Sequence, residues 1–226
     1  DTSAFATEGD SPQAQATMLR EAAAKLGIKD PIVAGHSYGG IVALAWAVEG
    51  LDVDSPQNAS GVVSFAGVAM PWPDALGAYY TINGSALGGG VVVPIVAALV
   101  PKGTVIEAVN NTFAPNPASE GYAEHLGGQL TMRPDSFRAN VRQVNTLYPN
   151  VVELSKRYPE LTLPIEILHG TADTTVPIHI HAREIVKIVP SVTVTELEGV
   201  GHMPHHVDTE AAIAAIDRAA RRAGLR

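Results

Sequence analysis

The chain has 226 residues, 46% of them hydrophobic and 17% charged, a composition that suits one globular domain with a sizeable core. Its formal net charge of −8 gives no basic field for phosphate backbones or anionic lipids, so nucleic acid is excluded as the expected partner. The absence of cysteine excludes a disulfide scaffold, a thiol nucleophile and a cysteine-bound metal, and it leaves the cellular compartment unassigned.

The first part of the chain predicts a helix, a buried strand and a second helix. Ser11 is a suitable N-cap before Pro12, and apolar residues at helical spacing continue from there toward Gly27. The apolar run 31–35 then indicates a short strand that enters a glycine-rich turn. The almost wholly apolar segment 41–48 indicates a buried helix directly after this turn.

Three more buried strands are expected further along the chain, at 62–66, 165–168 and 192–197. Because helical patterns lie between them, the alternation predicts an α/β fold in which a parallel sheet carries helices on both faces. A closing helix is expected after Asp208, which is a good N-cap. The apolar residues on one face of this helix are Ile213, Ile216 and Ala220, and Arg218, Arg221 and Arg222 lie toward its carbonyl end.

Residues 68–158 interrupt the alternation of strands and helices. Prolines, three glycines at 88–90 and short helical patterns replace it, and the apolar run 91–100 contains Pro94 and is too short to span a bilayer. An insertion after a strand is expected to lie over the carboxyl ends of the sheet, so this segment is predicted to be a mostly helical lid. The two flanking segments, 1–67 and 159–226, would then form the core.

The strongest motif is Gly35-His36-Ser37-Tyr38-Gly39, a Gly-x-Ser-x-Gly pattern between a predicted strand and a predicted helix. The two glycines are expected to leave room for a tight turn in which the serine adopts a strained backbone conformation. Such a turn would project the hydroxyl of Ser37 above the sheet, with the amides of the following helix directed at the same point. The motif therefore predicts a nucleophile elbow.

A serine nucleophile needs a base within hydrogen-bond reach and a carboxylate that orients this base. Asp173 follows the predicted strand at 165–168, and His202 follows the one at 192–197, so both are expected on loops at the carboxyl end of the sheet. By itself, Asp173 is better explained as an Asx turn or as the cap of a helix that begins near Val176. Its place between Ser37 and His202 in the chain favours the catalytic interpretation.

With these motifs the chain resembles the α/β-hydrolase superfamily, in particular the esterase, haloperoxidase-like and epoxide-hydrolase-like group that carries a helical cap. The resemblance rests on the motifs at 35–40, 169–177 and 199–205, and it covers nearly the whole chain. It implies an α/β-hydrolase fold, with Ser37 as nucleophile, His202 as general base and Asp173 as the orienting acid. Because the nucleophile is serine rather than aspartate, epoxide hydrolase and haloalkane dehalogenase chemistry is disfavoured, and no cofactor is implied.

The chain departs from this superfamily in one respect. Relatives begin with further strands and a His-Gly loop that supplies a second oxyanion-hole amide, and no such elements precede Ser37. The backbone amide of Tyr38 would then be the oxyanion donor in this chain, and the strand at 31–36 would have an unpaired apolar edge. We therefore expect a companion N-terminal segment of the same protein, as a separate chain or as omitted residues, to complete the sheet and the oxyanion hole.

Candidate substrate contacts are His36, Trp72, Tyr79, Tyr80 and Met203, although packing is the simpler explanation for most of them. An apolar lid would favour uncharged ester or acyl substrates.

The remaining histidines are assigned no part in catalysis. His205 is expected to support the loop that carries His202, and His36 is better explained by packing beneath the elbow. His179 and His181 have the spacing of a metal pair, but on a helix after Asp173 they would point to different faces, so no metal site is predicted.

These assignments predict a serine esterase that cleaves small to medium carboxylic esters through an acyl-enzyme. The same triad could act on another bond, as in a carbon–carbon hydrolase, a perhydrolase or an aminopeptidase. An aminopeptidase would be expected to hold an acidic cluster in the lid, for which the candidates are Glu107, Glu120 and Glu124. A binding module that keeps the hydrolase fold without catalysis is the alternative from another functional class.

Overall fold

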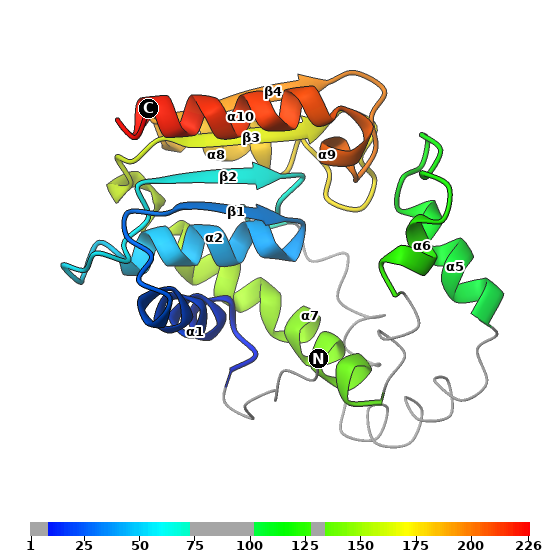
Figure 1. Cartoon of the computed structure of the whole chain (residues 1–226), viewed down its shortest axis with the longest axis horizontal. Coiled ribbons are helices and arrows are strands. Elements are labelled where there is room, and N and C mark those ends of the chain that lie inside the picture. Colours follow the sequence, from blue (N-terminus) through cyan, green and yellow to red (C-terminus); the bar gives the residue numbers. More distant parts are fainter. Residues whose placement is uncertain (1–8, 73–101, 128–133) are drawn as a thin grey trace.

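The centre of the molecule is a four-stranded parallel sheet in the order β1-β2-β3-β4 (Figure 1). The computed structural model describes residues 9–72, 102–127 and 134–226. All four strands lie where the apolar runs predict them, namely β1 (Ile32–His36), β2 (Gly61–Phe65), β3 (Ile165–Gly170) and β4 (Val192–Leu197). Because all of them run in the same direction, the loops that follow them gather at one edge of the sheet.

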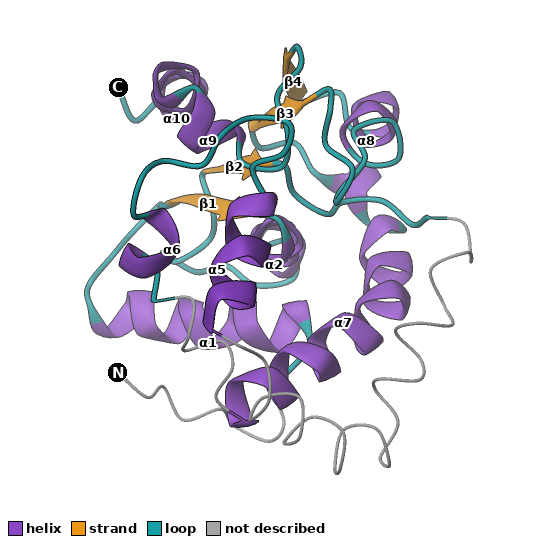
Figure 2. Cartoon of the chain, turned by 90° about the vertical axis from the view of Figure 1, so that its right-hand side faces the viewer, coloured by secondary structure: helices purple, strands orange, loops and turns teal. Residues whose placement is uncertain are grey.

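The described helices cover both faces of this sheet. Figure 2 shows α10 and α9 on one side of the strands and α2 and α8 on the other. Alternate strand residues point to the two sides, so that Val62 and Ile167 join the core beneath α2, whereas Val63 and Leu168 join the smaller core beneath α10. The helices are α1 (Pro12–Lys25), α2 (Tyr38–Glu49), α5 (Lys102–Asn111), α6 (Tyr122–His125), α7 (Pro134–Ser155), α8 (Ala182–Ile188), α9 (Pro204–Val207) and α10 (Thr209–Arg222), with a short 3-10 helix at Tyr158–Glu160.

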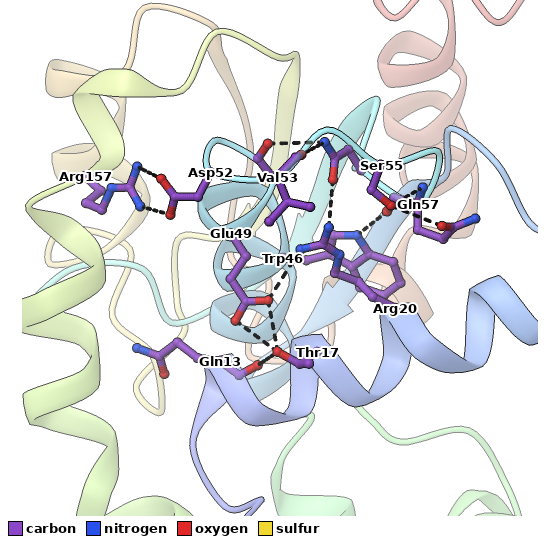
Figure 3. A network of polar contacts seen from close by, with 12 residues as sticks. Gln13, Thr17, Arg20, Trp46, Glu49, Asp52, Val53, Ser55, Gln57 and Arg157 are labelled. Atoms are coloured by element: carbon purple, nitrogen blue, oxygen red, sulfur yellow. Dashed lines mark hydrogen bonds and ion pairs between the residues drawn. The ribbon is translucent and has the colours of Figure 1, made fainter.

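Helix α1 begins as the sequence predicts and is attached to α2 by small and polar side chains. The hydroxyl of Ser11 accepts a hydrogen bond from the amide of Ala14, and Ala16 is fully buried against α2. Further along the two helices, Thr17 donates a hydrogen bond to Glu49, as Figure 3 shows. A pocket of about 460 Å³ lies beside this polar network, at the end of α2 opposite to Ser37. It is lined by Thr17, Arg20, Glu21, Ala24, Glu49, Asp52, Val53, Ser55 and Gln57.

The closing helix, α10, is correctly predicted, but a different face of it packs on the sheet. The side chain of Asp208 accepts from the amide of Ala211, so the predicted N-cap is confirmed. Ile213 and Ile216 are 55% and 39% exposed. The residues buried against the strands are instead Ala212, Ala215 and Ala219. Small side chains on this face let the helix lie close to the sheet, which the larger isoleucines would prevent.

Two arginines of α10 neutralise a carboxylate that is buried in the sheet. Glu166 lies within β3 and is 0% exposed. Arg218 Nε donates to it at 2.9 Å and Arg222 Nη1 at 2.5 Å, with the arginine side chains still partly exposed. A buried carboxylate needs such partners. These arginines therefore fix α10 to β3, in addition to lying at the helix end where the sequence placed them.

The described part of residues 68–158 contains α5, α6 and α7. Helix α7 packs on α2, and Val151 and Leu154 belong to the main core. Among the described residues, no helix combines the length and the apolar character that crossing a membrane requires.

Candidate active site

Ser37 lies at a sharp turn between β1 and α2. Its φ of 53° and ψ of −118° are strained for a residue with a side chain. The amide of Ser37 still donates to the carbonyl of Phe65 in the neighbouring strand β2, and the amide of Gly40 donates back to the carbonyl of Ser37 within the turn. Gly35 leaves no space for a side chain, because a Cβ there would lie 2.0 Å from the carbonyl oxygen of Gly39. Gly39 itself has nothing from the described residues within 4 Å of such a Cβ, so the close approach depends on the first glycine of the motif.

The structure brings together Ser37, His202 and Asp173, which are far apart in the sequence. The hydroxyl of Ser37 lies 2.9 Å from Nε2 of His202. On the other side of the ring, Nδ1 of His202 donates to Oδ2 of Asp173 at 2.7 Å. Both His202 and Asp173 are 5% exposed, so their hydrogen bond is shielded from water. This is the geometry in which a histidine can take a proton from serine while a carboxylate holds its tautomer.

The carboxylate of Asp173 has partners on both oxygens. Oδ1 accepts from the amides of Thr175 at 2.8 Å and Val176 at 2.9 Å, so the residue also forms the Asx turn that the sequence allows. Burial by itself would raise the pKa of Asp173. The hydrogen bonds from His169, His202 and the amide of Val176 outweigh this effect and hold the pKa below its usual range. Asp173 is therefore the charged partner of the histidine.

His36 links the elbow to the loop that carries His202. Its Nε2 donates to the carbonyl oxygen of His202 at 2.9 Å, and its ring lies 4.8 Å from the ring of His202 and 4.6 Å from that of His205. The ring of His205 in turn stacks on Phe65. Burial lowers the pKa of His36 to about 4 and that of His205 to about 3. Both rings are therefore neutral at pH 7 and contact residues of the elbow and of the His202 loop.

His181 supports the chain that follows β2. It precedes α8 in a turn, and not within a helix as the sequence analysis expects. Its Nδ1 accepts hydrogen bonds from the amides of Ala69 and Met70, and its ring faces the edge of Trp72. These contacts engage Nδ1 of His181 in holding the chain at Ala69 and Met70. Within the described ranges, no group of three or more histidine, aspartate or glutamate side chains is arranged to hold a metal ion.

The other candidate substrate contacts occupy different environments. Trp72 is partly buried and packs edge-on against Tyr148 of α7 at 5.1 Å between ring centroids. Met203 directly follows His202 and is buried. Tyr79 and Tyr80 lie outside the described residues. Contact with substrate thus stays a prediction for all of these residues and for His36.

A loop of the inserted segment contacts the backbone on both sides of Val200. The amide group of Asn116 accepts a hydrogen bond from the amide of Gly201 at 2.9 Å and donates to the carbonyl of Gly199 at 3.4 Å. A Cβ on Gly201 would lie 2.0 Å from the carbonyl oxygen of Ala114, so the two segments meet backbone to backbone. Sequence analysis missed this contact, because a lone asparagine in a proline-rich loop carries no signal of its partner.

Buried neutral histidines predict a loss of stability in mild acid. Burial also lowers the pKa of His181 to about 4, like that of His36, whereas in the unfolded chain both histidines titrate near 6.5. Below pH 6.5 the unfolded chain binds protons that the folded chain excludes, so the free energy of unfolding falls as the pH drops from 6.5 toward 4. We expect a loss of about 1–2 kcal/mol for each of the two histidines between pH 7 and pH 5, measured by urea unfolding.

Matched variants separate this effect from general acid sensitivity. The substitution His181→Asn keeps an acceptor for the amides of Ala69 and Met70 but removes the titrating ring, so it should reduce the pH dependence. His125→Gln changes an exposed histidine and should leave the pH dependence as in the parent protein. Stability that stays level down to pH 4 would contradict the prediction.

Comparison with known proteins agrees with this fold. The model of the alpha/beta hydrolase family matches residues 4–216. No curated protein sequence matches the chain. Among solved structures, an alpha/beta hydrolase fold protein from Burkholderia ambifaria is 20% identical, with a TM-score of 0.67, over 91% of this chain and 72% of that one.

Two further structures show the same fold. A thermophilic esterase from Thermogutta terrifontis is 20% identical, with a TM-score of 0.59, over 94% of this chain and 73% of that one. A bromoperoxidase from Bacillus anthracis is 17% identical, with a TM-score of 0.68, over 96% and 78%. The parallel sheet, the strained serine turn and the family match over most of the chain lead to one conclusion: this protein belongs to the α/β-hydrolase family.

Proposed function

We propose that the protein is a serine hydrolase that cleaves small to medium carboxylic esters. The observation that carries this proposal is the continuous chain of hydrogen bonds from Ser37 through His202 to Asp173. In this mechanism His202 takes the proton of Ser37 as its hydroxyl oxygen attacks the ester carbonyl, and then gives this proton to the leaving alcohol. Water, deprotonated by the same histidine, releases the acid from the acyl-enzyme.

Covalent labelling tests the nucleophile directly. The protein is treated with a fluorophosphonate and its intact mass is measured, and hydrolysis of p-nitrophenyl butyrate is followed in parallel. We expect one adduct per chain, because only a serine paired with a base reacts readily. Ser37→Ala should remove the adduct and the hydrolysis, whereas Ser119→Ala, at an exposed position, should keep both. An adduct that survives in Ser37→Ala would refute the assignment.

The alternatives differ in the bond that is cleaved or in the absence of turnover. Glu107, Glu120 and Glu124, the candidates for an aminopeptidase cluster, are all exposed, which favours esters over peptides. The similarity in fold to a thermophilic esterase is consistent with ester substrates. A non-catalytic binding module would form no adduct. In this proposal, residues 68–158 form the lid, and the apolar side chains of its helices would select the substrate.

We further propose that a companion segment of the same protein pairs with the outer edge of β1. In the part of the chain that the structure describes, β1 pairs with β2 alone, and all its residues are at least partly exposed, whereas β2 is buried throughout. An exposed edge of this kind favours addition of a further strand. The amide of Tyr38 would supply one oxyanion donor, and the companion segment the other. A fragment of the same protein that copurifies with this chain, and is detected in the intact-mass measurement, would support this pairing.

A further inference from the structure

His169 lies at the carboxyl end of β3 and approaches the same carboxylate oxygen as His202. Its Nε2 is 2.7 Å from the carbonyl oxygen of Val176 and 3.3 Å from Oδ2 of Asp173. The side chains of His169 and Asp173 are both 0% exposed. Since each neighbouring oxygen can only accept a hydrogen bond, Nε2 carries the hydrogen; it donates to the carbonyl of Val176, and Oδ2 of Asp173 lies within reach of the same N–H group.

The other ring nitrogen of His169, Nδ1, is buried, makes no hydrogen bond with the described residues and so does not stabilise the side chain at this position. Leaving such an atom unpaired typically costs about 1–3 kcal/mol. If the ring only filled space in the core, an apolar side chain of similar size would fit at lower cost. What distinguishes histidine at this position is therefore the pair of contacts that Nε2 makes.

These contacts complete the enclosure of the carboxylate. The amides of Thr175 and Val176 hold Oδ1 of Asp173, while His202 and His169 approach Oδ2. Because His169 also binds the carbonyl of Val176, one ring fixes the carboxylate and the peptide segment that binds its other oxygen. The orientation of Oδ2 toward His202 is thereby determined from two directions.

We propose that His169 is a positioning residue of the triad, which orients the carboxylate of Asp173 and withdraws part of its negative charge. This role rests on the proposed function of Ser37, His202 and Asp173. Without the second donor, the full charge of the carboxylate would face His202 and would hold a proton on that ring more tightly. Less neutral His202 would then be present at a given pH, and the carboxylate would be free to turn.

Two substitutions separate the donor from the bulk of the side chain. His169→Leu keeps apolar volume but removes the hydrogen, whereas His169→Gln keeps an N–H group near the position of Nε2. For His169→Leu we expect kcat per labelled site to fall about tenfold or more with little change in KM, since a hydrogen bond to a charged group contributes about 1.5–3 kcal/mol. The pH at which kcat/KM reaches half its maximum should move upward, and His169→Gln should restore most of both values.

A purely structural role gives a different result. It would lower the melting temperature of His169→Leu but leave kcat per labelled site and the pH profile unchanged, and that outcome would overturn the proposal. The rate of fluorophosphonate labelling gives the same pH profile without an ester. A wrong choice of substrate therefore leaves this test intact.

A measurement on the unaltered protein needs neither activity nor a folded variant. Two-bond ¹⁵N–¹H correlations of the histidine rings identify which nitrogen carries the hydrogen. The proposal requires the Nε2–H form for His169 and the Nδ1–H form for His202. Finding His169 as Nδ1–H would refute the proposal even if Ser37 proves to be the nucleophile. Because the carbonyl of Val176 alone also requires Nε2–H, the required pair of tautomers supports the proposal together with the restored kcat and pH profile of His169→Gln.

Discussion

Replacing Asp173 by asparagine is expected to lower kcat about 10⁴-fold, as measured with p-nitrophenyl butyrate. The amides of Thr175 and Val176 require an acceptor at the position of Oδ1, so the asparagine oxygen must occupy it. Its NH₂ group then faces Nδ1 of His202, which would have to accept a hydrogen bond instead of donating one. The hydrogen of the neutral ring moves to Nε2, and that nitrogen can no longer take the proton of Ser37.

A second aspartate provides a matched control. Oδ1 of Asp208 also accepts a hydrogen bond from a backbone amide, that of Ala211, but Asp208 serves as the N-cap of α10. Because asparagine caps helices about as well as aspartate, Asp208→Asn should keep both stability and kcat. If Asp173→Asn keeps a tenth or more of the parent kcat, the charge and acceptor capacity of this residue are not needed to orient His202.

Alanine at Gly35 is expected to lower the free energy of unfolding by about 4 kcal/mol or more, measured by urea unfolding followed by circular dichroism. Its Cβ would lie 2.0 Å from the carbonyl oxygen of Gly39, 2.3 Å from the carbonyl carbon of the same residue and 2.8 Å from the amide nitrogen of Gly40. All three are backbone atoms of the first turn of α2, so no side chain can rotate away. Either the turn opens or the helix separates from β1.

The second glycine of the same motif serves as the control. A Cβ on Gly39 meets no described atom within 4 Å, and the residue lies in the first turn of α2. Because alanine favours helix by up to about 1 kcal/mol relative to glycine, Gly39→Ala should keep or raise the stability. Equal losses for the two variants would show that overlap with the helix backbone is not what requires Gly35.

The strands and the chemistry-bearing loops could be predicted because each rests on a local signal. Apolar runs bounded by turn residues mark all four strands, and parallel strands place their following loops at one edge. This is why Ser37, Asp173 and His202 could be grouped before their geometry was known. The hydrogen bonds between them then follow from the fold and from no pattern in the sequence.

Features that depend on depth of packing could not be predicted in this way. Hydrophobicity favours Ile213 over Ala212 as a core residue of α10. In the structure Ala212 is the buried one, because the helix lies so close to the sheet that only a small side chain fits between them. The sequence analysis assigns His169 no role of its own within the motif 169–177, although a polar residue near the end of a buried strand, four positions before Asp173, is a signal of one. Glu166 is likewise a polar residue in a buried strand, which indicates a buried partner. The sequence does not identify this partner, because Arg218 and Arg222 lie far away in α10.

The contacts of Asn116 bear on the engineering of substrate range. A chimera that exchanges the whole of residues 68–158 for the corresponding segment of another hydrolase would remove the side chain that holds Gly199 and Gly201, and with it a support of the neighbouring His202. A chimera that keeps the native residues 113–116 would leave this support in place. Within the inserted segment, residues 113–116 thus belong, in function, to the loop of the base, just as Val151 and Leu154 of α7 belong to the core.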